Sequence, residues 1–190
     1  MRLFVAVDLP EAVKESLGAA VAPLQAACPA ARWVKPANWH LTLAFLGEVE
    51  SGWVPALSRV LTEKLGREGG FRAHFGALGS FPNSGPVRIV WVGLEPSVRL
   101  VRLAELVEDG LRSAGAPFDD KPFRSHVTLA RCQPPWPAHL RTDLARQSTA
   151  FTDRLGGIAL TCDRVTLFSS VLGRSGPAYR AEASFALQSP

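Results

Sequence analysis

The stretch KPANWHLTLA, residues 35–44, returns later in the chain as KPFRSHVTLA, residues 121–130. The two copies are identical at six of ten positions and align without a gap. Each copy places His-x-Thr among apolar residues, although the whole chain has only four histidines. The repeat therefore indicates either a duplicated structural unit or one site that is built from two halves.

Each copy has the alternation of polar and apolar residues that is typical of a β-strand. Residues two apart on a strand point to the same face, so His40 shares a face with Thr42, and His126 with Thr128. The apolar residues of the two copies are predicted to point to the opposite face, and these are Leu41, Leu43, Phe45, Val127 and Leu129. The sequence thus predicts two strands that each have an apolar core face and a polar His/Thr face.

Patterns outside the repeat predict a mixture of strands and helices. Strands are predicted at residues 2–9, 39–46, 71–81, 86–94, 125–132, 157–162, 164–171 and 179–187. Apolar residues at three- and four-residue steps predict helices from Pro10 to about residue 27, at 54–65 and at 97–114, with a short one within 134–148. This order lacks regular β–α alternation and therefore favours an α+β fold.

Composition is that of an ordinary globular protein. The chain has 190 residues, of which 47% are hydrophobic and 20% are charged, and this length suffices for a real core. No apolar run approaches the ~20 residues of a membrane span, and the first residues lack the cleavage region of a signal peptide. We therefore expect a cytoplasmic protein that has no membrane partner.

Charge and cysteine content narrow the function only a little. The net charge is +4, with 17 arginines against four lysines, which is compatible with a polyanionic partner but does not name one. Cys28, Cys132 and Cys162 are widely spaced and form no CxxC pair. This spacing argues against a disulfide framework and against a zinc–thiolate site, so we expect free thiols.

The residue types of the repeat suit proton transfer at a phosphodiester. Imidazole titrates near neutral pH and serves as either general acid or general base. A reaction that deprotonates water and protonates a leaving oxygen needs one of each. Threonine hydroxyls can meanwhile donate hydrogen bonds to the oxygens of an anion. Two His-x-Thr strands around one cleft would supply both functions.

These residues resemble a known family. The paired His-x-Thr motifs, with FVAVDLP (residues 4–10) and FPNSGPVRIVWVGLE (residues 81–95), are similar to the two-histidine (2H) phosphoesterases. Within them, the chain resembles the RNA 2′,3′-cyclic phosphodiesterase branch, long called bacterial 2′-5′ RNA ligases. The likeness extends over about residues 1–187. One His-x-Thr is unspecific, whereas two with these flanking sequences are highly specific.

The resemblance implies a fold and a reaction. The fold is a single domain, residues 1–190, of two pseudo-twofold lobes in which two antiparallel sheets flanked by helices enclose a central cleft. The reaction is metal-free hydrolysis of an RNA 2′,3′-cyclic phosphate end to a 2′-phosphomonoester. The same likeness makes His40 the proton donor, His126 the proton acceptor, and Thr42 and Thr128 the phosphate-binding hydroxyls. The near symmetry of the repeat gives no independent basis for the direction of proton transfer.

Arg131 matches a basic position of the same branch near the phosphate. Strict alternation puts Arg131 on the face opposite His126, so a phosphate contact requires a strand end or a β-bulge there. A terminal nucleotide could stack on one exposed aromatic side chain, and the sequence does not choose among the candidates, which are Trp39, Phe45, Phe168 and Tyr179. His74 and His139 lack a Thr two residues later and are predicted to be structural or exposed.

Other functions find less support in the residues. Two histidines make a poor zinc site, and no Asp, Glu or Cys near either copy supplies a third ligand, so no metal or cofactor is predicted. The open alternatives are a non-catalytic RNA-end or nucleotide-binding module and 2′-5′ RNA ligation on the same site. RNA ends with a 2′,3′-cyclic phosphate and small cyclic nucleotides are the predicted partners. Nothing in the sequence requires more than a monomer.

Overall fold

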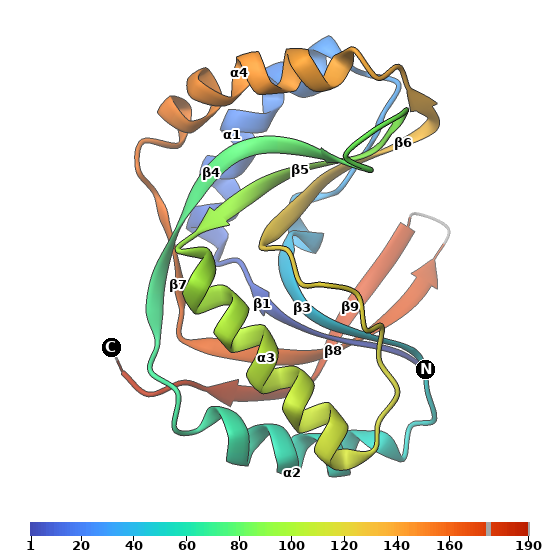
Figure 1. The fold of residues 1–190 in the computed structure, drawn as a ribbon, viewed down its shortest axis with the longest axis vertical. Coiled ribbons are helices and arrows are strands. Elements are labelled where there is room, and N and C mark those ends of the chain that lie inside the picture. Colours follow the sequence, from blue (N-terminus) through green and yellow to red (C-terminus); the bar gives the residue numbers. More distant parts are fainter. Residues whose placement is uncertain (174–175, 190) are drawn as a thin grey trace.

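A computed structural model describes residues 1–173 and 176–189 of the chain (Figure 1). Its helices are α1 (Glu11–Ala27), the short 3-10 helix η1 (Pro36–Asn38), α2 (Trp53–Leu65), α3 (Ser97–Ala114) and α4 (Leu140–Leu155). Its strands are β1 (Arg2–Asp8), β2 (Arg32–Trp33), β3 (His40–Glu48), β4 (Phe71–Phe81), β5 (Val87–Glu95), β6 (His126–Trp136), β7 (Ala159–Cys162), β8 (Arg164–Gly173) and β9 (Gly176–Ala186). The predicted α+β class is confirmed.

The strands of the described residues form one curled, antiparallel sheet in the order β7-β4-β5-β6-β3-β1-β8-β9, and β2 pairs separately with β6. Its two halves are joined between β6 and β3 by a single residue pair, Leu41 with Val127. The two sheets expected from the family resemblance are therefore the halves of one continuous sheet. Beyond that pair the two strands diverge, and β2 takes over as the neighbour of β6.

The two halves have the same internal order, which accounts for the sequence repeat. In each half a strand, a long helix and a His-x-Thr strand follow one another, as β1-α1-β3 and as β5-α3-β6. The next long strand is exchanged, because β4 pairs with β5 whereas β8 pairs with β1. Each half of the sheet thus contains segments from both halves of the sequence.

Helices cover the sheet in two pairs, with α1 beside α4 and α2 beside α3 (Figure 1). The helices turn apolar faces inward, because their apolar residues recur at helical spacing. Burial is complete at Leu17 of α1, Leu61 of α2, Leu103 of α3 and Phe151 of α4. The same core receives Val127 and Leu129 from β6, so the apolar face predicted for that strand is confirmed.

The structure differs from the predicted elements in three places. The two-residue strand β2 and the single turn η1 were not predicted, because elements this short carry no periodic pattern. Helix α4 extends to Leu155, well past the short helix expected there. Strand β6 continues to Trp136, although the residues between Arg131 and Trp136 have no register partner in β5. Among the described helices, none is both long and apolar enough to cross a membrane.

Candidate active site

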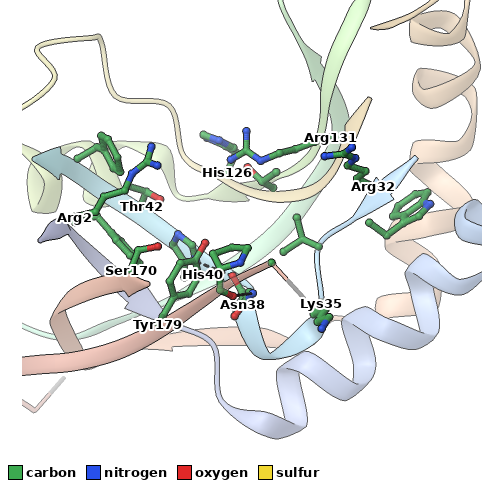
Figure 2. A pocket seen from close by; sticks show the side chains of 17 residues that line it. Arg2, Arg32, Lys35, Asn38, His40, Thr42, His126, Arg131, Ser170 and Tyr179 are labelled. Carbon is green, nitrogen blue, oxygen red and sulfur yellow. Dashed lines mark hydrogen bonds between the residues drawn. The ribbon is translucent and has the colours of Figure 1, made fainter. Parts of the chain in front are cut away.

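The two histidines stand at the start of the two strands that meet in the middle of the sheet. His40 is the first residue of β3 and His126 is the first residue of β6. Both side chains are half-buried, and both line one cavity of about 640 Å³ (Figure 2). The repeat is therefore a duplicated structural unit whose two copies line one cavity.

The same backbone contact holds both imidazole rings. Nδ1 of His40 lies 2.7 Å from the backbone oxygen of Asn38, and Nδ1 of His126 lies 2.7 Å from the backbone oxygen of Arg124. A carbonyl oxygen can only accept, so each Nδ1 carries a hydrogen and donates it. In the neutral rings Nε2 then has a free lone pair, which makes both rings competent to accept a proton.

Aromatic side chains surround His40. The ring centroid of Phe4 lies 4.8 Å from that of His40, and the Tyr179 ring meets the imidazole edge-on at 5.2 Å. Burial lowers the pKa of the His40 imidazole below its ordinary value. The hydrogen bond to Asn38 and the negative charge of Asp8 act in the opposite direction and favour the protonated ring.

His126 has a different aromatic environment but the same direction of shift. Phe81 meets its ring edge-on at 5.1 Å, and the Trp91 centroid lies 6.1 Å away. Burial again lowers the pKa of His126, and the positive charges of Arg131 and Arg124 lower it further. Burial therefore shifts both imidazoles in the direction of the neutral form.

A β-bulge in β6 turns Arg131 into the cavity. Between Thr128 and Ala130 the register with β5 slips by one residue, so Leu129 is extra, and both Leu129 and Ala130 are buried. Beyond the bulge the alternation resumes one step out of phase, which puts Arg131 on the same side as Thr128. This is the irregularity that the sequence required for an Arg131 contact with phosphate, and Arg131 does line the cavity.

The matching bulge in β3 moves Phe45 in the same way. The register with β1 slips between Thr42 and Ala44, which makes Leu43 the extra residue. The prediction that Phe45 points to the core face is therefore wrong, since Phe45 lines the cavity. The guanidinium of Arg2 lies over its ring, 5.0 Å from the centroid. Period-two alternation cannot reveal such a shift, because a bulge leaves no mark in the polarity pattern.

The walls of the cavity are basic. Positive charge suits a phosphate ligand, and guanidinium groups match its oxygens well. Among the described residues the lining contains no Asp or Glu, and its cationic members are Arg2, Arg32, Lys35 and Arg131. Lys121, the repeat counterpart of Lys35, is instead exposed and pairs with Asp119 at 2.6 Å.

All the residues predicted for the site lie around this cavity, and these are His40, Thr42, His126, Thr128 and Arg131 (Figure 2). Their chemical roles stay predictions. Of the aromatic candidates, Tyr179 and Phe45 line the cavity, whereas Trp39 is buried in the core. Phe168 stacks on Phe4, 5.3 Å between centroids.

Sequence reasoning missed the lining residues that come from distant strands and from the segment before β3. Arg2, Phe4 and Ser170 enter the cavity from β1 and β8, and Arg32 and Trp33 enter it from β2. Phe4 begins the FVAVDLP segment, but nothing in the local sequence indicates that it or the other residues line a cavity. The sheet order brings them to the histidines, because β1 lies between β3 and β8 and because β2 pairs with β6.

Other reactive side chains lie apart from this cavity. Within residues 1–173 and 176–189, no three His, Cys, Asp or Glu side chains are grouped so that they could hold a metal ion. His74 and His139 are exposed. The three cysteines are free thiols, as predicted, and burial raises the pKa of Cys132 to about 11 and that of Cys162 to about 12.

Comparison with known proteins agrees with this geometry. Residues 9–174 match the family described as the 2′-5′ RNA ligase superfamily. The chain belongs to the 2′-5′ RNA ligase superfamily, whose members are two-histidine phosphoesterases. The expected family membership is thus confirmed.

Curated relatives in this superfamily carry one name. The RNA 2′,3′-cyclic phosphodiesterase of Thermus thermophilus is 34% identical over 99% of this chain and 91% of its own length. The protein of that name from Thermotoga maritima is 30% identical over 95% of this chain and 92% of its own length. Both likenesses include the two His-x-Thr strands and the helices around them.

Solved structures have the same fold. A crystal structure of a Thermus thermophilus protein superposes with a TM-score of 0.77 at 30% identity, over 100% of this chain and 99% of that one. Escherichia coli LigT in complex with 3′-AMP superposes with a TM-score of 0.72 at 28% identity, over 98% and 97% of the two chains. The superfamily fold therefore extends over nearly the whole of this chain.

Proposed function

We propose that this superfamily member hydrolyses the 2′,3′-cyclic phosphate at an RNA 3′ end to a 2′-phosphomonoester. The observation that carries the proposal is the pair of imidazoles held by equivalent Nδ1 contacts at one basic cavity. The curated relatives named for this activity support the substrate class. Small cyclic nucleotides present the same reacting group and are further candidate substrates.

The proposed reaction needs one proton acceptor and one proton donor. Nε2 of neutral His126 takes a proton from water as the water oxygen bonds to phosphorus. The bond from phosphorus to O3′ breaks, and protonated His40 gives its Nε2 proton to O3′. His126 is then protonated and His40 neutral, and exchange with solvent restores both. Each proton transfer contributes about 10²–10⁴ to the rate.

The phosphate itself is held by the neighbouring side chains. Thr42 and Thr128 stand two residues after the histidines on the same strand faces, so their hydroxyls can donate to the two nonbridging oxygens. Arg131 supplies a charge-assisted hydrogen bond from the same side. The three residues stand on strands rather than loops, so their backbone positions are set by the sheet, and donors that are positioned in advance stabilise the charge of the transition state.

The proposal assigns no role to a metal ion. In the proposed steps protons move between imidazoles and oxygens, and cationic side chains of the lining supply positive charge at the cavity. A binding module would have no need of two imidazoles with free Nε2 atoms, since arginine and lysine bind phosphate without titrating near neutral pH. Cytoplasmic location and a monomeric state complete the proposal as predictions from sequence.

The test uses EDTA-treated protein and an oligoribonucleotide that ends in a 2′,3′-cyclic phosphate. We expect the cyclic end to open to the 2′-phosphate alone, identified by chromatography against both isomer standards. A 3′-phosphate product would reverse the leaving group and contradict the assignment of O3′. Tight binding without opening would favour the binding module, and joining to an added 5′-hydroxyl oligonucleotide would reveal ligation. Loss of activity that added metal restores would refute the metal-free mechanism.

A further inference from the structure

The two halves of the site differ at the residue beside each histidine. In the sheet, Asp8 of β1 is the register partner of His40, whereas Gly93 of β5 is the register partner of His126. Directly paired residues of antiparallel strands project to the same face. A carboxylate therefore accompanies His40, and the corresponding place beside His126 has no side chain at all.

Two contacts hold the carboxylate of Asp8. The Nζ atom of Lys14, on the first turns of α1, lies 3.1 Å from its Oδ1. The same oxygen accepts a hydrogen bond of 2.9 Å from the backbone N–H of Leu9. Lys14 is 8% exposed, although a lysine is rarely buried without a charged partner. The carboxylate of Asp8 thus places a negative charge at the end of β1, and the positive charge of Lys14 weakens its electrostatic effect on neighbouring groups.

The two rings differ in the charges that act on them. The carboxylate of Asp8 acts on His40 as a negative charge, whereas Arg131 and the other imidazole act on it in the opposite direction, and the phenol ring of Tyr179 lies edge-on to it. The charged groups that act on His126 are both cations, Arg131 and Arg124. Of the two histidines, only His40 has a carboxylate from the described part of the chain acting on it.

We propose that Asp8, restrained by Lys14, is a positioning residue that favours the protonated form of His40 and so makes His40 the acid and His126 the base. The inference rests on the function proposed above and deepens it. It supplies the direction of proton transfer that the near-symmetric motifs leave open. The carboxylate acts through the imidazole and touches no reacting atom.

Two substitutions should move the pH profile of kcat/KM in opposite directions. Asp8→Asn keeps an oxygen for the Leu9 N–H but removes the charge, so His40 loses its proton at lower pH. We expect the basic limb to move to lower pH, so that the ratio of variant to wild-type kcat/KM falls as the pH rises. Lys14→Met keeps the buried aliphatic stem and strengthens the field of Asp8. Its basic limb should move to higher pH, and the acid limb should stay in place in both variants.

A titration of the histidine ring protons by NMR identifies the affected residue independently of turnover. We expect Asp8→Asn to lower the titration midpoint of His40, assigned by its loss in His40→Ala, and to leave His126 unmoved. Asp8→Glu should restore part of the wild-type profile. These measurements distinguish an electrostatic role from a purely structural one. A loss of stability alone would not move the basic limb to lower pH in Asp8→Asn and to higher pH in Lys14→Met.

Several outcomes would overturn the inference. If Asp8→Asn shifts the acid limb instead, the inference is wrong. His40 would then be the base, or its pKa would be lower than that of His126. Unchanged limbs and an unmoved His40 resonance would mean that Asp8 has no influence on the site. If wild-type protein fails to open the cyclic phosphate, the proposed function falls, whereas the NMR titration still decides whether Asp8 acts on His40.

Discussion

Arg131 offers the sharpest test of the site, because only the bulge in β6 brings it to the cavity. We consider Arg131→Met, which keeps the length of the side chain and removes its charge and its donors. If Arg131 binds the phosphate, the substitution removes a hydrogen bond between charged groups. Such a bond is worth about 1.5–3 kcal/mol.

The expected loss follows from that energy. Since each 1.4 kcal/mol is a factor of ten, kcat/KM should fall about 10- to 150-fold. The pH profile should change too, because the cation of Arg131 lowers the pKa of both His40 and His126. Without that cation both imidazoles hold their protons more readily, so both limbs of the profile should move to higher pH.

The assay is initial-rate hydrolysis of an oligonucleotide with a 2′,3′-cyclic end, measured across pH 4 to 9 at constant ionic strength. Arg102→Met is the matched control, since Arg102 is exposed on α3 and the change in net charge is the same. We expect the control to keep the wild-type rate and profile. A loss in Arg131→Met below about threefold, under 1 kcal/mol, with both limbs in place would refute the phosphate contact.

His40→Ala and His126→Ala should each lower kcat by about 10²–10⁴, and a variant that retains more than a few per cent of the rate would contradict the two-histidine mechanism. Burial lowers the pKa of both imidazoles, so the folded state binds protons less readily than the unfolded chain. Their contribution to the free energy of unfolding should therefore be complete above about pH 6.5, and it should decline as the pH falls through the pKa values of the folded state. Thermal unfolding of either alanine variant between pH 7 and 5 should show a flatter decline than wild type. Thr128→Ala should weaken transition-state binding by about 1–3 kcal/mol, seen in kcat/KM, whereas Thr128→Ser should stay near wild type. A Cβ on Gly79 would overlap the ring of Trp91, so Gly79→Ala should cost about 1–3 kcal/mol of stability in urea unfolding, and an unchanged midpoint would show that the ring is free to move.

Much of the fold follows from local pattern. The helix at Ser97–Ala114 was predicted to the residue, because its apolar residues recur at helical spacing over more than four turns and Gly115 ends it in the left-handed conformation. The strands at Phe71–Phe81 and Val87–Glu95 follow from apolar runs separated by a Pro-Asn-Ser-Gly turn. Predictions were weakest for short elements, such as β2, where too few residues exist to establish a period.

The candidate site also combines features that local sequence predicts with features that it does not. The two His-x-Thr strands and their polar faces can be read from the local sequence, because a duplicated motif with period two is visible without knowing its neighbours. The inward turn of Arg131 and Phe45 depends on the fold, since a bulge arises from the register with a neighbouring strand. The pairing of His40 with Asp8, and of His126 with Gly93, depends on the fold in the same way. Pairing between strands distant in sequence creates both features, and no local pattern contains that information.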